Sequence, residues 1–253
     1  MRLALRSAVG GGFFLIDDLF LSFFLSFPVS FPAEPAPRIR YCVTGANSRV
    51  AVPSLLKEAA TMSAHTIRAV FDDKTIRVYQ AYRPDIALPA VASGRFVPPF
   101  KMGRMTWIKP SFNWMMYRSG YAAKPGQEIV LGVDITREGF EWALANAALS
   151  TFTPDIHASY EAWRKEIASK PVRIQWDPER DWRLQPIEGM RTIQIGLSEE
   201  AVERYVYDWI VRIEDVTTIA HRMVGAANEP SFSPALQEMV YPIPQGLQIP
   251  NSV

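Results

Sequence analysis

The sequence is short of the residue types that build disulfide frameworks and metal centres. Its 253 residues include one cysteine and three histidines. A single thiol, Cys42, cannot form an internal disulfide, and His65, His157 and His221 lack the spacing of metal ligands. We therefore expect neither a disulfide scaffold nor a cysteine–histidine metal site. So little cysteine is typical of a protein from a reducing compartment, and we predict the cytoplasm.

An excess of charge of one sign is also missing. Lys and Arg number 27 against 26 Asp and Glu, which leaves a formal net charge of +1. No global field attracts this chain to nucleic acid or to an anionic membrane, so any such binding requires a local patch. An uninterrupted apolar run of about 20 residues, the length that spans a bilayer, is absent as well. The apolar fraction of 48% is nevertheless ample for a core.

Residues 1–61 differ in composition from the rest of the chain. They hold seven of the fourteen phenylalanines and none of the seven tryptophans. The apolar stretch Phe13–Phe31 resembles a signal sequence, but Asp17 and Asp18 interrupt it and no small-residue cleavage site follows. We predict that residues 1–61 are a disordered or non-native extension before a natural start at Met62. Secretion is the alternative.

From residue 62 to 227, strand and helix patterns follow one another irregularly. This order favours one α+β domain with a split, mixed β-sheet flanked by helices. Residues 228–253, rich in proline, are expected as an extended C-terminal tail. The predicted strands are Thr66–Phe71, Thr75–Tyr82, Met105–Ile108, Glu128–Ile135, Val172–Asp177, Thr192–Leu197 and Ile210–Val216. The main predicted helices are Arg83–Ser93, Ser111–Ser119, Thr136–Ala148, Ser159–Ala168 and Ser198–Asp208.

Cations gather before the helix that begins at Ser111. Lys101, Arg104 and Lys109 precede it closely, and Ser111 is a favourable N-cap residue. The free amides of a helix start attract anions. These four residues therefore predict a phosphate-binding site.

Two tryptophans accompany these cations. Trp107 lies on the preceding strand, and Trp114 lies four residues before Arg118, a spacing at which a guanidinium stacks on an indole ring. Cations beside indoles favour a pocket for a flat, anionic ligand, such as a nucleotide or a nucleic acid. The alternative is a core pair of tryptophans with the cations exposed to solvent.

A second cluster surrounds Pro178. We expect this proline to end its strand and to bring three carboxylates together in a turn beside Arg180, those of Asp177, Glu179 and Asp181. Such a group can hold a cation or serve as acid and base, and we take Asp177 and Glu179 as the catalytic candidates. The alternative is a surface bend with an ion pair. Gln194, which faces away from the apolar side of its strand, completes the predicted catalytic set.

Gln80 is unusual because it follows Ile76 and Val78 on the same face of a strand. A buried amide is costly unless it is paired. Gln80 is therefore either satisfied by its neighbours or open to a ligand at the end of the strand. We include it among the predicted cofactor-binding residues.

Long segments of the chain resemble the family known as domain of unknown function 4291. The matching stretches include IRAVFDDKTIRVYQAY (67–82), FKMGRMTWIKPSFNWMMYRSGYAAKPGQE (100–128), VRIQWDPERD (172–181) and AVERYVYDWIVRIEDVT (201–217). The resemblance covers about residues 67–244. It implies a family but no activity.

A fainter likeness is to the ADP-ribosyltransferase superfamily, whose split α+β sheet holds NAD in a cleft. The likeness implies that Gln80, the Thr106–Trp107 strand and Gln194 occupy its three strand positions, with glutamine where the superfamily usually has a catalytic glutamate. We therefore predict a nucleotide-binding group transferase, with NAD as the candidate cofactor. The alternatives are a non-catalytic RNA- or DNA-binding domain and a structural or interaction domain.

Overall fold

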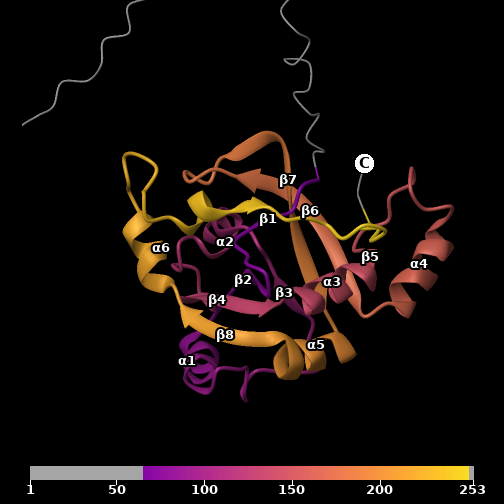
Figure 1. Ribbon diagram of the computed structural model, residues 1–253, viewed down its shortest axis with the longest axis horizontal. Helices are drawn as coiled ribbons and strands as arrows, with labels where there is room; N and C mark the ends of the chain where they lie inside the picture. The colour runs from indigo at the N-terminus through magenta and orange to yellow at the C-terminus, as the bar shows by residue number, and fades with distance from the viewer. Residues whose placement is uncertain (1–64, 251–253) are drawn as a thin grey trace, which may run out of the picture. The chain divides into compact units, whose positions relative to one another are not determined.

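The structure is a computed structural model that describes residues 65–250, which belong to one compact unit (Figure 1). The predictions made for residues 1–61, including the signal-like stretch and Cys42, lie outside the described residues. The strands are β1 (Arg68–Ala69), β2 (Thr75–Tyr82), β3 (Thr106–Ile108), β4 (Ile129–Thr136), β5 (Ala147–Leu149), β6 (Val172–Arg180), β7 (Pro186–Leu197), β8 (Ile210–Asp215) and β9 (Met239–Val240). The helices are α1 (Pro84–Ser93), α2 (Phe112–Ser119), α3 (Arg137–Ala145), α4 (Tyr160–Ser169), α5 (Glu200–Arg204) and α6 (Thr217–Met223), with a π-helical turn η2 (Tyr205–Trp209) and a 3₁₀ turn η3 (Pro234–Gln237).

The strands form two main sheets, which makes the fold α+β as predicted. The first sheet has the order β2-β4-β8 and is antiparallel; the second has the order β3-β7-β6-β5, in which β5 and β6 run parallel. A backbone bridge joins the two sheets, because the Tyr79 amide of β2 donates to the Lys109 carbonyl just after β3, at 2.7 Å. Helix α1 lies along β8 and α3 packs against β4, β6 and β7 (Figure 1).

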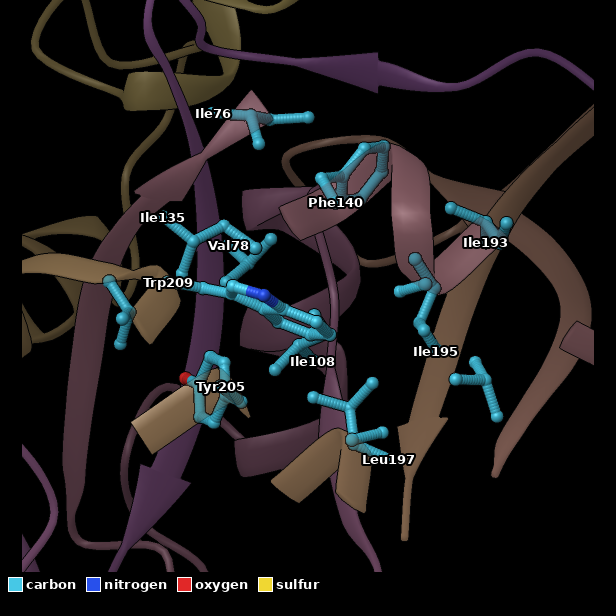
Figure 2. Packing of buried hydrophobic residues seen from close by; sticks show 14 of the residues in the cluster. Ile76, Val78, Ile108, Ile135, Phe140, Ile193, Ile195, Leu197, Tyr205 and Trp209 are labelled. Atoms are coloured by element: carbon cyan, nitrogen blue, oxygen red, sulfur yellow. The ribbon is translucent and has the colours of Figure 1, made fainter. Parts of the chain in front are cut away.

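The core fills the space between the two sheets. Figure 2 shows isoleucines of both sheets, such as Ile135 and Ile195, around the ring of Trp209. Trp209 is able to reach this position because α3 carries a glycine there. A Cβ atom at Gly139 would lie 2.3 Å from Cγ of Trp209, closer than any side chain tolerates.

The helix ends follow the chemistry expected from the sequence. Ser111 caps α2 by accepting a hydrogen bond from the Trp114 amide at 3.2 Å. Thr136 caps α3 in the same way. Gly94 and Gly120 end α1 and α2 in the left-handed conformation that favours glycine.

Several predicted element boundaries were wrong. The strand predicted to begin at Thr192 begins at Pro186, and the one predicted over Thr66–Phe71 covers only Arg68–Ala69. Strand β6 continues through Pro178 to Arg180, because the register shifts there and an irregular rung does not require the missing amide. The helix predicted to reach Ala148 ends at Ala145, since Ala147–Leu149 pairs with β6 as a strand. The helix predicted to reach Asp208 changes to a π-helical turn at Tyr205.

The C-terminal segment from Asn228 is attached to the body of the unit. Strand β9 pairs with β1 rather than with a neighbour in sequence, and the Tyr241 side chain is buried against Phe71 and Phe140. This segment therefore supplies part of the core. Within residues 65–250, no helix has the length and apolar character that a membrane crossing requires.

Candidate ligand pocket

A pocket of about 490 Å³ opens where β2, β3 and the loop before β3 meet. We call it the cationic pocket. Six residues predicted to bind a cofactor are among those lining it, namely Gln80, Lys101, Arg104, Trp107, Lys109 and Arg118, and the lining also includes Tyr82, Arg83, Phe100, Thr106 and Met115. No carboxylate is among the described residues that line this pocket. Its electrostatic character is therefore strongly positive in a chain whose net charge is nearly zero.

Lys109 forms the buried part of the cationic pocket. Its residue is only 7% exposed, and its ammonium donates to the Trp107 carbonyl at 2.9 Å. Burial, together with the nearby charge of Arg118, lowers the pKa of Lys109 to about 7, and the charge of Asp177 opposes the shift. Within the described residues no carboxylate lies within 4 Å of this amine as an ion-pair partner. Lys109 is consequently a candidate for an amine that is partly neutral at physiological pH.

The polar face of the second sheet lies beside Lys109. Trp107 pairs with Gly196, and Gln175 pairs with Gln194, so these side chains alternate with the apolar ones that face the core. The Trp107 ring rests on Gly196, where an added Cβ would lie 3.0 Å from the indole. A glycine at this position thus lets the ring lie close to the sheet.

Two glutamines hold the carboxylate of Asp177 on this face. Gln175 donates to Oδ1 at 2.9 Å and Gln194 donates to Oδ2. These two hydrogen bonds fix the orientation of the carboxylate. Two of the three predicted catalytic residues, Asp177 and Gln194, are therefore in contact, and the charge of Asp177 acts on Lys109.

Gln80 satisfies its hydrogen bonds inside the protein, although it lines the pocket. Its amide nitrogen donates to the Thr106 hydroxyl at 2.7 Å and to the Trp107 carbonyl at 3.2 Å. Its oxygen accepts from the Tyr205 hydroxyl at 2.6 Å, which comes from the π-helical turn. Gln80 thus supports the wall of the pocket and positions the backbone of Trp107.

The start of α2 has internal partners in place of a bound phosphate. The Phe112 amide donates to Oε1 of Glu238 at 2.7 Å, and the Ser111 hydroxyl donates to Oε1 of Glu179 at 2.8 Å. Burial raises the pKa of both carboxyls, and that of Glu238 lies well above its usual value, with the charge of Glu179 adding to the shift. We call this pair the α2 carboxylate site. Ser111 and Glu179 therefore lie together, apart from the residues that line the cationic pocket.

Trp114, a residue of α2, is buried near the amine of Lys109. Its ring centroid lies 5.7 Å from Nζ of Lys109 and 6.4 Å from the ring of Tyr117. The cation beside Trp114 is thus Lys109, whereas we expected Arg118 there. Trp114 contributes to the apolar surroundings of the amine and is not among the pocket-lining residues.

Sequence reasoning missed Glu238, Tyr205 and the burial of Lys109. Glu238 lies in a segment without periodicity, so nothing in the local pattern distinguishes it from a solvent-exposed glutamate. The burial of Lys109 had a signal, because Lys109 follows Trp107 by two residues and extends the same face of a short strand.

Comparison with known proteins places the chain in a family without assigning an activity. The family described as Domain of unknown function (DUF4291) matches residues 66–242, which include every strand and helix named above. A search of curated proteins finds no match to the chain. The protein is therefore a member of the DUF4291 family.

Proposed function

We propose that the cationic pocket binds a nucleotide and that the protein is a group transferase acting on it. The observation that carries this proposal is that Lys101, Arg104 and Arg118 surround a buried amine and an indole in one pocket. Cations of this kind bind phosphate oxygens, and the exposed part of Trp107 offers a surface on which a base stacks.

The reaction would take place at the buried end of the pocket. Asp177 is held by two amides, and its charge already acts on Lys109. In a transfer reaction these groups would position the reacting atoms and move a proton, and the fixed cations would stabilise charge that develops on phosphate oxygens. NAD is the candidate cofactor, in line with the faint likeness to ADP-ribosyltransferases, and the cytoplasm remains our proposed location.

Titration of the full chain with NAD, ADP-ribose and ATP, followed by calorimetry, tests nucleotide binding. We expect saturable binding that the double substitution Lys101→Ala and Arg104→Ala weakens at least about tenfold, since each lost phosphate contact costs around 1 kcal/mol. The matched control is Arg164→Ala with Lys165→Ala, two exposed cations on α4. No binding of any of the three compounds at millimolar concentration would contradict the proposal.

A second candidate is RNA or DNA binding, because Lys101, Arg104 and Arg118 are exposed at the mouth of the pocket and accessible to a polymer. The two functions differ in their response to salt. Binding of a single strand loses affinity steeply, with a slope of roughly −0.7 per neutralised phosphate in a plot of log K against log salt. A nucleotide in a closed pocket shows a much smaller slope.

A further inference from the structure

Lys109 has the setting of a reactive amine. Its side chain is more than nine-tenths buried, its single hydrogen bond goes to a backbone carbonyl, and no carboxylate in the described structure lies within ion-pair distance. An ordinary structural lysine would place its ammonium in solvent or against an acid. Lys109 is nevertheless among the residues that line the cationic pocket, so a ligand bound there lies against this residue.

The groups that surround this amine can assist a reaction. Arg118 from α2 disfavours the ammonium form, as a neighbouring cation does for lysines that attack carbonyl groups. Asp177 from β6 lies near enough for its charge to act on the amine, and its two oxygens are fixed by Gln175 and Gln194. The site thus holds an amine and, more than 4 Å from it, an oriented carboxylate whose charge acts on that amine.

Lys101 and Arg104 favour a ligand that carries phosphate groups as well as the reacting carbon. Both are exposed cations that line the same pocket as Lys109, together with Arg118. A ligand whose carbon reaches the buried amine would place its phosphates against these cations. This arrangement selects a phosphate-bearing molecule over a neutral aldehyde.

We propose that Lys109 is a catalytic amine that forms an imine with the aldehyde carbon of a phosphate-bearing sugar. The lone pair of Nζ attacks the carbonyl carbon, a C–N bond forms, and the carbonyl oxygen takes up a proton to become a hydroxyl. The amine then loses a proton, the hydroxyl accepts one and leaves as water, and a C=N bond remains. Solvent water carries the proton between these steps, and the charge of Asp177 favours the cationic species along the way. Hydrolysis reverses the sequence and regenerates the amine.

The proposal rests on the proposed nucleotide site and narrows it. The shared chemistry is an open-chain sugar aldehyde on a phosphate, and it has two sources. Ribose 5-phosphate is a free sugar phosphate, and ADP-ribose is a nucleotide whose terminal ribose opens to an aldehyde. NAD has the same phosphates but its terminal ribose carbon is blocked by nicotinamide, so NAD should bind without forming an imine.

Reductive trapping of the full chain tests the imine. The protein is incubated at pH 7 with ribose 5-phosphate, ADP-ribose or NAD in the presence of cyanoborohydride, and pyridoxal 5′-phosphate with borohydride serves as a reactive positive probe. Mass spectrometry after trypsin then locates the adduct. Lys109 is the only lysine in the tryptic peptide of residues 105–118, so an adduct there is unambiguous.

We expect the adduct in peptide 105–118 with pyridoxal phosphate and with at least one of the two sugars, and none with NAD. At pH 7 Lys109 should carry about tenfold or more the label of the exposed Lys124, because an ordinary lysine with a pKa near 10.4 is almost fully protonated there. The sugar that traps faster identifies the source. Lys109→Met removes the adduct, and Lys165→Met, an exposed lysine of α4 outside the pocket, retains it.

Folding of Lys109→Met is checked by circular dichroism, and protection of Lys109 from pyridoxal phosphate by NAD in the unmodified chain gives a measurement that needs no variant. If peptide 105–118 stays unlabelled while exposed lysines react, the imine proposal is overturned. When calorimetry still shows ADP-ribose binding in that case, the proposed nucleotide function survives. Absence of binding as well as of label overturns both.

Discussion

Two buried ionisable centres lie against α2, and they differ in what surrounds them. At the α2 carboxylate site, Glu238 accepts from the Phe112 amide and Glu179 accepts from Ser111. In the cationic pocket, Lys109 has one carbonyl as partner and its nearest charges include another cation. A buried group that accepts from the start of a helix stabilises the fold, whereas one that lines a pocket is available to a ligand. The comparison separates structural from functional charge in this molecule.

Glu238→Ala gives the largest expected effect, because it removes the acceptor for the first amide of α2. We expect the free energy of unfolding to fall by about 2–3 kcal/mol, the upper part of the cost of leaving a buried donor without its acceptor. Urea denaturation at pH 7 measures the change. Glu229→Ala, an exposed glutamate of the same C-terminal segment, is the control and should change stability little. Equal effects of the two substitutions would break the comparison.

Lys109→Met should act in the opposite direction. Methionine keeps most of the volume and removes a buried amine, so we expect the protein to gain about 1–3 kcal/mol in unfolding free energy at pH 7. The same variant should lose the trapping of sugar phosphates. A loss of stability instead would show that the amine is a structural partner like Glu238. Lys165→Met on the exposed face of α4 is the control.

The two centres should also give opposite responses to pH. The folded state lowers the pKa of Lys109 to about 7, so the unfolded chain binds more protons above that pH. The contribution of Lys109 to stability therefore rises from pH 7 toward 10, by at most about 1.4 kcal/mol per unit. The raised pKa of Glu238 has the reverse sign, and its contribution is lost as pH increases above the usual range of a carboxyl.

Unfolding curves of the unmodified chain, Lys109→Met and Glu238→Gln between pH 5 and 9 measure these slopes. Glutamine retains the oxygen that accepts from Phe112, so it isolates the charge of Glu238. We expect Lys109→Met to exceed the unmodified chain in unfolding free energy, by an amount that decreases as the pH rises. The unfolding free energy of Glu238→Gln should increasingly exceed that of the unmodified chain as the pH rises. If the unfolding free energies of all three proteins changed equally with pH, the two sites would not differ electrostatically as proposed.

Arg104→Ala gives the smallest expected effect on stability. Arg104 is exposed at the mouth of the pocket, so the unfolding free energy should stay within about 0.5 kcal/mol of the unmodified value. Nucleotide affinity should nevertheless fall, by roughly five- to tenfold for one lost phosphate contact. Calorimetry and urea denaturation on the same preparation test this separation. A variant that loses stability but not affinity would place Arg104 with the structural charges.

Much of the fold was predictable because local chemistry and tertiary packing agree. The cap at Ser111 is confirmed, and a strand does cover the predicted range Val172–Asp177. The errors fall where tertiary pairing overrides local preference. Residues after Asn146 continue a helical pattern, yet they pair with β6, because a parallel neighbour is present there.

The candidate site was predictable in its residue types but not in its grouping. Lys101, Arg104 and Lys109 lie close in sequence, so their meeting in one pocket required only a turn. The partner of the α2 start could not be foreseen, because Glu238 is 126 residues away from Phe112 along the chain. Asp177 and Gln194 required the register of two strands, which side-chain alternation alone does not determine.

The backbone rung between Tyr79 and Lys109 gives this protein a built-in sensor. The Tyr79 amide donates its hydrogen to the carbonyl of Lys109, the residue that lines the pocket. The rate at which this amide hydrogen exchanges with deuterium therefore reports on the backbone at Lys109. A ligand seated on Lys109 should slow this exchange relative to the Arg77 amide, which is held by Val70 instead. The exchange rate of the Tyr79 amide would then report whether a ligand occupies the cationic pocket, without a chromophore or an assay for a reaction.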